Sequence, residues 1–360
     1  IHPSTLELMG ELGLLEEFLK LPHQRATTIG AFFGDREYAF ADFTHLPTRC
    51  KFIALMPQWD FLNFVAERGG TFPAFHLHMR AEAIGLIEEG ARIAGVRVQT
   101  ADGVMEVRAD LTVGCDGRHS TVRACANLKP VDLGAPMDVL WFRLPKKAGD
   151  PPDTMGRFTA GGIAVLIDRG DYWQCAFLIR KGGMEDTRSA GLPAFRQSVA
   201  RRVPMFADRV DELRDWNQIK LLTVAVDRLA RWHRPGLLCI GDAAHAMSPI
   251  GGVGVNLAVQ DAVAAANILW RPLAAGTLEE ADLEHVQIRR LFPTRVTQRM
   301  QVIVQNNVIG RVLKDSGPLT APLLLRLTSR FAPLRRLPAR FVGMGVRPEH
   351  VKTPDRALLP

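Results

Sequence analysis

The sequence lacks most of the signals that would place it outside the soluble globular proteins. No apolar run approaches the roughly 20 residues that a membrane span needs. The five cysteines are scattered and contain no CxxC pair, which argues against a disulfide framework or a zinc site and favours a reducing, cytoplasmic location. We find no signal peptide, internal repeat or low-complexity tract.

The net charge of +7 raises the question of nucleic acid. The arginines are dispersed, however, and no recognised nucleic-acid-binding motif accompanies them. Arginine also holds anionic small molecules such as a pyrophosphate through paired hydrogen bonds. We therefore expect no nucleic-acid partner. His76 and His78 have strand spacing, but no acidic or cysteine partner lies near them in the sequence, so we expect no metal site.

The chain of 360 residues is long enough for two domains, or for one large α/β body with a lobe. Apolar periodicity predicts helices over 3–20, 58–68, 120–126, 192–202, 254–269 and 279–307, with Ser4 or Thr5 capping the first and a proline-broken tail to 341 following the last. It predicts a hairpin over 27–42 and strands over 51–56, 75–79, 83–88, 93–99, 111–114, 139–144, 163–167, 172–179, 219–226 and 237–240.

The most informative stretch is Gly236 to Asp261, GLLCIGDAAHAMSPIGGVGVNLAVQD. It predicts a buried strand, a Gly-Asp turn, a glycine-rich loop and a helix that begins near Gly254. The turn brings the Asp242 carboxylate to the end of the strand, where it can accept hydrogen bonds from hydroxyl groups. Glycine permits close approach of main chain to a ligand, and the positive end of the helix points at the same spot. This chemistry suits a flavin ring and its ribityl tail.

A second stretch, ADLTVGCDGRHSTVR, covers Ala109 to Arg123. A strand ends near Val113, a turn follows at Asp116-Gly117, and Ser120 caps a helix that contains Arg123. Ligands of open α/β sheets bind at the carboxyl ends of strands, so Asp116 and Arg123 stand where a dinucleotide would lie. By itself the stretch is more typical of an ordinary turn with a surface arginine, and only the Gly241-Asp242 turn downstream favours the ligand interpretation.

The pair of motifs resembles the FAD-dependent aromatic hydroxylases, the class A flavoprotein monooxygenases related to p-hydroxybenzoate hydroxylase. CDGRHSTVR is similar to the second fingerprint of that family, and GDAAHAMSPIGGVGVNLAVQDA to the third. The resemblance covers nearly the whole chain in element order. It implies an α/β fold with a Rossmann-like FAD-binding domain, a mixed or antiparallel β-sheet substrate lobe and a helical C-terminal tail.

Several roles follow from the resemblance. Asp242 would bind the ribityl chain, Pro249 would lie near the flavin ring, and the main chain at Val255 and Asn256 would meet the pyrimidine edge. The resemblance assigns FAD contacts also to Gln58, Asp116, Arg123, Gly252 and Gly254, with Asp116 shared between FAD and the nicotinamide donor. His2 stands where relatives often carry an arginine that touches the flavin, which makes a direct role for His2 doubtful.

One departure from the family pattern concerns the first βαβ unit, whose GxGxxG turn holds the pyrophosphate. No GxGxxG occurs in the chain, which begins with Ile1 rather than Met. Since Pro3 onward resembles the family just after that unit, we expect roughly forty to fifty preceding residues to be absent. A Rossmann sheet without them would bind FAD poorly and expose strand edges.

The resemblance implies NAD(P)H- and O₂-dependent hydroxylation of an aromatic or related planar small molecule through a C4a-hydroperoxyflavin, with no catalytic side chain. Two alternatives stay open. One is another FAD-dependent oxidoreductase of the same fold, a halogenase or geranylgeranyl-type reductase, although the halogenase signature WxWxIP is absent. The other is a truncated flavin-binding module without catalysis.

The division expected for the chain is discontinuous. The FAD-binding domain would take 1–25, 48–70, 80–130 and 227–310, the substrate lobe 26–47, 71–79 and 131–226, and the tail 311–360. Candidates for the substrate side are Trp141, Phe142, Arg143, Trp173 and Phe177, although aromatic strand residues more often form core. Leu319 to Arg340 mixes leucine and arginine, which suits either a membrane-surface segment or a terminal helix packed on the FAD domain. A monomer and a homodimer are both compatible with the sequence.

Overall fold

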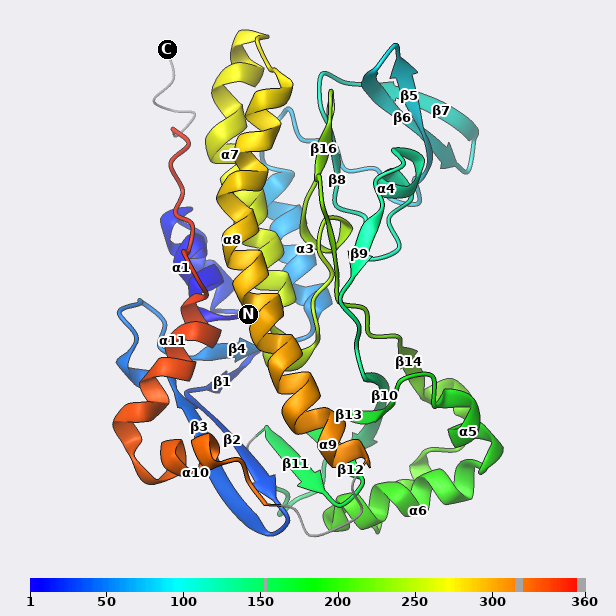
Figure 1. The fold of residues 1–360 in the computed structure, drawn as a ribbon, viewed down its shortest axis with the longest axis vertical. Coiled ribbons are helices and arrows are strands. Elements are labelled where there is room, and N and C mark those ends of the chain that lie inside the picture. Colours follow the sequence, from blue (N-terminus) through cyan, green and yellow to red (C-terminus); the bar gives the residue numbers. More distant parts are fainter. Residues whose placement is uncertain (152–153, 315–319, 355–360) are drawn as a thin grey trace.

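The computed structural model describes residues 1–151, 154–314 and 320–354. Two long helices, α7 (Gly254–Ala275) and α8 (Glu280–Val304), pack against each other along the length of the molecule (Figure 1). A seven-stranded sheet lies at one end of this pair, and two three-stranded sheets lie beside the upper part of the pair. This mixed α/β architecture agrees with the predicted fold class.

The remaining helices are short. They are α1 (Pro3–Glu11), α2 (Leu15–Phe18), α3 (Gln58–Gly69), α4 (Thr121–Cys125), α5 (Met184–Ser189), α6 (Leu192–Arg202), α9 (Gly310–Lys314), α10 (Leu323–Arg330) and α11 (Arg336–Met344). The strands are β1 (Gln24–Ala26), β2 (Thr28–Phe33), β3 (Arg36–Asp42), β4 (Ile53–Leu55), β5 (Glu82–Glu89), β6 (Arg92–Thr100), β7 (Gly103–Arg108), β8 (Thr112–Gly114), β9 (Pro130–Asp132), β10 (Met137–Pro145), β11 (Met155–Thr159), β12 (Gly162–Asp168), β13 (Tyr172–Arg180), β14 (Lys220–Leu222), β15 (Asp227–Leu229), β16 (His233–Arg234) and β17 (Leu237–Cys239).

The large sheet has the order β14-β10-β13-β12-β11-β2-β3 and is antiparallel except where β11 runs parallel to β2. Its strands alternate between two faces, as the period of a β-strand requires. One face packs on α6 and buries a cluster that includes Phe142, Trp173 and Phe177. These three aromatic residues are therefore core, and of the aromatic substrate candidates only Trp141 lines the cavity described below.

The short parallel pair β8 and β17 positions the two sequence motifs. Gly114 is the register partner of Cys239, so the two strands end side by side. The loop after β8 contains Cys115 to Arg118, and the turn after β17 contains Gly241 and Asp242. A buried apolar cluster between β17, α7 and α8, with Leu238, Ala265 and Val286 among its members, fixes both ends in place.

Helix α7 ends at Gly276, whose positive φ of 66° suits the left-handed conformation that commonly terminates a helix. The segment Ile250–Ala275 is long and apolar enough to cross a membrane, which corrects the expectation that no such run exists. The same helix buries three polar side chains, Asn256, Gln260 and Asp261, which bond to other parts of the protein. It is thus a core helix of this fold.

Other sequence predictions need correction. The helix expected over 3–20 is broken at Gly13 (φ 72°), and neither Ser4 nor Thr5 caps it, because α1 begins at Pro3. Residues 75–79 form no strand, and the strand expected over 219–226 is shortened to β14. Leu319 lies outside the described residues. The expectation that a βαβ unit precedes Pro3 stays a prediction.

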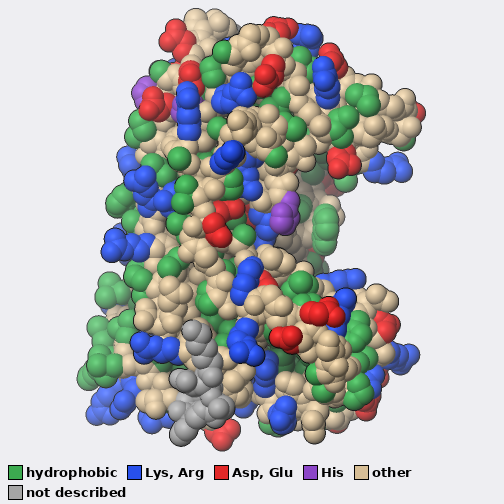
Figure 2. All heavy atoms as spheres, turned by 45° about the vertical axis from the view of Figure 1, so that its right-hand side comes forward, with side chains coloured by type: hydrophobic (Ala, Val, Ile, Leu, Met, Phe, Trp, Pro, Cys, Tyr) green, Lys and Arg blue, Asp and Glu red, His purple; other side chains and the backbone are tan. Residues whose placement is uncertain are grey.

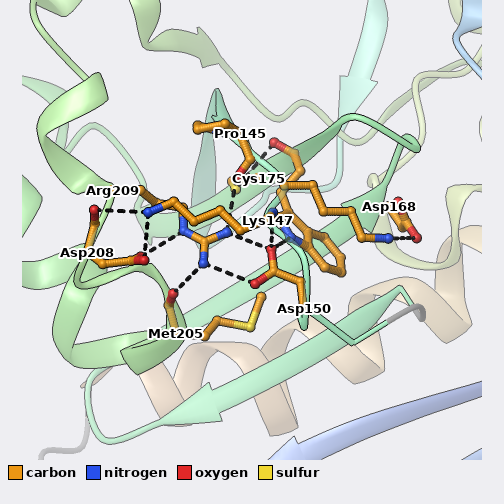
Figure 3. A network of polar contacts seen from close by, with 10 residues as sticks. Pro145, Lys147, Asp150, Asp168, Cys175, Met205, Asp208 and Arg209 are labelled. Carbon is orange, nitrogen blue, oxygen red and sulfur yellow. Dashed lines mark hydrogen bonds and ion pairs between the residues drawn. The ribbon is translucent and has the colours of Figure 1, made fainter.

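A buried ion pair ties the loop after β10 to the turn after α6 (Figure 3). Arg209 donates from Nη1 to Asp150 Oδ2 (2.6 Å) and from Nη2 to Asp150 Oδ1 (3.0 Å). The indole Nε1 of Trp173 donates to the same carboxylate at 2.9 Å. Burial acts to raise the pKa of Asp150, but the hydrogen bonds from Arg209, the Lys147 backbone and Trp173 outweigh it and lower the pKa to about 2.

We predict that Arg209→Leu lowers the free energy of unfolding by about 3 to 5 kcal/mol, because it leaves the Asp150 carboxylate buried without its partner. Urea denaturation measures this loss. Arg214→Leu is the matched control, since Arg214 is exposed and its pair with Glu212 lies at the surface. A loss for Arg209→Leu no larger than that of the control would contradict the structure.

The stability that Asp150 contributes also depends on pH. Its folded pKa of about 2 lies below the ordinary value of 3.8, so the contribution is fully present above that ordinary value. It is lost as the pH falls through about 2. We expect Asp150→Asn to destabilise the protein at neutral pH and the gap from the unmodified protein to narrow in acid, as followed by unfolding curves across that range.

Candidate flavin site

A cavity of about 2390 Å³ is lined both by the large sheet and by the loops after β8 and β17. Its volume exceeds the roughly 300–1,000 Å³ of ordinary ligand pockets. Figure 2 shows the surface of the molecule hollowed at its right-hand edge, between the β5–β7 end above and the α5–α6 end below. On the sheet side its walls are apolar, with Val139, Trp141, Val165 and Leu178 among them.

Asp242 reaches this cavity from the end of β17. Gly241 makes the turn with a φ of 57°, and Arg118 from the loop after β8 places Nη2 3.4 Å from Asp242 Oδ2. Burial raises the pKa of Asp242, while the charge of Arg118 acts in the opposite direction. The stretch 109–123 thus contacts the stretch 236–261 through Arg118, a residue that the sequence analysis did not single out.

The glycine loop and the start of α7 complete the same wall of the cavity. Pro249, Gly252, Gly254 and Val255 all line it. Gly252 has a φ of 62°, a conformation that side chains with a Cβ rarely adopt. The first N–H groups of a helix have no partner within it, and the first that bonds back here is Leu257 N, to Val253 O at 3.1 Å. The N–H groups that open α7 therefore remain available to a ligand.

Asn256 uses its side chain within the protein. Its Oδ1 accepts from His2 N (3.1 Å) and from the Thr5 hydroxyl (2.7 Å), and its Nδ2 donates to Gly252 O at 3.3 Å. The side chain thus ties α1 to the glycine loop. Among the described residues that line the cavity, Asn256 does not occur. The resemblance had assigned only the main chain of Asn256 to a ligand, and that assignment stays a prediction.

His2 lines the cavity in spite of its doubtful role in the sequence. Its Nδ1 lies 2.8 Å from Val342 O, and because a carbonyl oxygen only accepts, Nδ1 carries the proton. Burial lowers the pKa of His2 to about 3, so the ring is neutral at physiological pH. A Cβ built on Gly252 would lie 3.6 Å from His2 Nε2, which places the ring beside the glycine loop.

Asp116 and Arg123 build the loop that carries Arg118. Asp116 accepts from the Ser120 hydroxyl and, at 3.1 Å, from Val122 N, so it supports the first turn of α4, whose N-cap is Ser120. It is not among the residues that line the cavity in the described part of the chain. Arg123 donates from Nη2 to Arg118 O (2.7 Å) and from Nη1 to Ala243 O (3.3 Å). The buried Arg123 guanidinium therefore joins the two motif loops, and the FAD contact assigned to it stays a prediction. Gln58 begins α3 and lines the cavity.

A buried polar network fixes the Gly241-Asp242 turn from behind. The Asp261 carboxylate accepts from Gly241 N (3.1 Å) and from Arg290 Nε (2.9 Å), and it lies 2.6 Å from His245 Nε2. Burial acts to raise the pKa of Asp261, but His245 and Arg290 outweigh it and lower the pKa. His245 thus has a structural role, since its ring bonds to the buried Asp261 carboxylate.

Two glutamines of α8 hold the loop before Pro249, and the sequence analysis missed both. Gln301 accepts from Ser248 N (3.1 Å) and donates to Ser248 O (2.9 Å) and Ile250 O (3.0 Å). Gln298 donates to Ala246 O at 3.0 Å. The signal in the sequence is a pair of amides three residues apart, which places both on one face of a helix.

These groups fit FAD. A carboxylate that accepts from hydroxyls, free N–H groups at a helix start and a glycine loop without side chains converge on one cavity wall, and apolar walls face them. A ring with a polar edge and a hydroxylated tail needs this set of groups.

The comparisons agree with that fit. A family model described as FAD binding domain matches residues 1–300. The 6-methylpretetramide 4-monooxygenase of Streptomyces rimosus is 36% identical over 94% of this chain and 81% of its own length. The chain belongs to the FAD-dependent aromatic monooxygenases. FAD is therefore its cofactor and NAD(P)H its reductant.

Solved structures of the family share the fold. The OxyS anhydrotetracycline hydroxylase from Streptomyces rimosus superposes with a TM-score of 0.72 at 20% identity, over 100% of this chain and 70% of its own. A probable FAD-dependent monooxygenase from Pseudomonas aeruginosa gives a TM-score of 0.73 at 18% identity, over 87% of both chains. At such identities the likeness shows the fold alone.

We predict that Asp242→Ala weakens FAD binding by about 10- to 100-fold, the effect of losing a hydrogen bond to a charged group. Quenching of FAD fluorescence on titration measures the dissociation constant. Asp211→Ala is the control, because the Asp211 side chain is 90% exposed and outside the cavity. Equal affinity of the two variants for FAD would remove Asp242 from the site.

Proposed function

We propose that the substrate of this monooxygenase is an extended, fused-ring aromatic molecule that lies between the large sheet and the flavin. The observation that supports it is the size and apolar character of the sheet wall, where Val139, Trp141, Ile163, Val165 and Leu178 line a cavity larger than a single-ring compound fills. The name of the Streptomyces rimosus relative, 6-methylpretetramide 4-monooxygenase, points to the same class.

The residues of the site hold the cofactor and exclude water. FAD, when bound, supplies the oxidation of NAD(P)H and the activation of O₂. Asp242 accepts hydrogen bonds from the ribityl hydroxyls, and the N–H groups at Val255 and Asn256 donate to the pyrimidine edge. Gln58 contributes a polar contact at the start of α3, and Pro249 restricts the loop beside the ring. The apolar sheet wall keeps water from the reacting face.

The chain divides between these two tasks in our proposal. The FAD-binding part is assembled from 1–25, 48–70, 80–130 and 227–310, and the substrate lobe from 26–47, 71–79 and 131–226. Support comes from the large sheet, which recruits β2 and β3 from the N-terminal segment to β10–β14. The protein acts in the cytoplasm, as a monomer or homodimer, on a small molecule.

Filling the substrate side tests this division. Val165 lines the cavity on the sheet wall, so Val165→Trp should lower kcat/KM about tenfold or more by excluding substrate. Affinity for FAD should stay within about twofold, since the flavin wall is untouched. Val104→Trp, at an exposed position of β7, is the control. If Val165→Trp lost FAD binding as well as activity, the assignment of the sheet wall to the substrate and of the opposite wall to the flavin would be contradicted.

The reaction itself separates the alternatives. A monooxygenase consumes NAD(P)H and O₂ and yields a product that carries one oxygen atom from ¹⁸O₂, as mass spectrometry detects. A product halogenated in the presence of halide, or a saturated product without O₂ uptake, would identify the halogenase or the reductase. Binding of FAD with neither NAD(P)H oxidation nor O₂ uptake, across a panel of fused-ring aromatics, would leave only a flavin-binding module.

A further inference from the structure

One surface of the protein adjoins the cavity at its edge but carries none of the residues assigned to the cofactor. It is formed by α10, the 3₁₀ turn Ala332–Arg335 and α11, which lie together at the lower left of Figure 1, and we call it the C-terminal face. Large apolar side chains are exposed on it: Leu323 at 67%, Leu324 at 69%, Phe331 at 51% and Leu337 at 70%. So many large apolar side chains grouped on one surface indicate an interaction site.

The charge of this face has one sign. Residues 320–348 contain six arginines and neither aspartate nor glutamate. Five of these arginines are exposed, namely Arg326, Arg330, Arg336, Arg340 and Arg347. Helices that combine exposed leucine and phenylalanine with arginine are typical of segments that lie on a membrane surface.

The face is a fixed part of the folded body. Helices α10 and α11 both pack on β3, and α11 also contacts α1. Arg335 donates to Thr328 O (2.9 Å) and to Ser329 O (2.5 Å), which joins the two helices. Helices α10 and α11 therefore pack mainly on β3 of the large sheet, whereas Glu349 and His350 bond to α8 and α7. The exposed apolar residues of the two helices are held in a fixed arrangement.

We propose that the C-terminal face docks on an anionic lipid bilayer. A second copy of the chain fits the face less well, because a symmetric dimer would oppose its arginines to each other. Anionic headgroups complement the arginines, while the exposed leucines and Phe331 enter the boundary between headgroups and acyl chains. Leu324, Leu337 and Phe341 also line the cavity, so its apolar edge adjoins the docked surface. Docking is independent of whether the substrate proposal holds.

Vesicle co-sedimentation of the whole chain tests the proposal without turnover. We expect binding to vesicles of phosphatidylcholine with phosphatidylglycerol, weakened by salt, and little binding to phosphatidylcholine alone.

The double variant Arg326→Gln/Arg330→Gln should weaken binding roughly thirty-fold, at about 1 kcal/mol for each arginine. Leu323→Ser/Phe331→Ser should weaken it by at least about tenfold. The latter two residues are not among those that line the cavity in the described part of the chain, so activity on a soluble substrate should be unchanged.

The control is Ile288→Ser/Phe292→Ser on α8, where the exposed fractions are 60% and 57%. It should bind vesicles as the unmodified protein does. Equal binding to neutral and anionic vesicles, or unchanged binding by the Leu323→Ser/Phe331→Ser variant, would overturn the proposal. A dimer in solution that this variant dissociates, with no vesicle binding by the unmodified protein, would assign the face to a second copy instead.

Discussion

The parallel pairing of β8 with β17 is the constraint on which the site depends. It is only three residues long, from Leu237↔Thr112 to Cys239↔Gly114, yet it brings together two loops that are more than 100 residues apart in the sequence. The Arg118–Asp242 contact and the bridge from Arg123 to Ala243 exist only because both strands end at the same edge. The helix that follows, α7, then directs its free N–H groups at the same point.

Polar groups buried behind the loops keep this arrangement rigid. Asp261 and Arg290 hold the Gly241 turn, Gln298 and Gln301 hold the segment before Pro249, and Asn256 fastens α1 to the glycine loop. Buried polar groups are costly unless they are fully bonded. Their concentration behind a loop that has few side chains of its own explains how a glycine-rich segment keeps one conformation.

The sequence predicts the local part of this structure well, because Gly-Asp turns, the Ser120 cap and the helix start at Gly254 are encoded in neighbouring residues. It also identifies Asp242 and the glycine loop, since their spacing is specific. Long-range partners are harder to foresee. Nothing near Arg118 indicates that it meets residue 242, and Asp116, which the motif emphasises, instead bonds to Ser120 and Val122 at the start of α4. Phe142 and Trp173 could not be separated from Trp141 by pattern, because alternate residues of a strand look alike until the sheet shows which face is covered.

Function depends on the Asp242 carboxylate and the first N–H groups of α7 meeting the same flavin. A crystal structure of the FAD complex tests this most directly. We expect a ribityl hydroxyl about 2.5–3.0 Å from an Asp242 oxygen and the pyrimidine edge at hydrogen-bond distance from Val255 N. An isoalloxazine bound elsewhere, with Asp242 still paired only to Arg118, would contradict it.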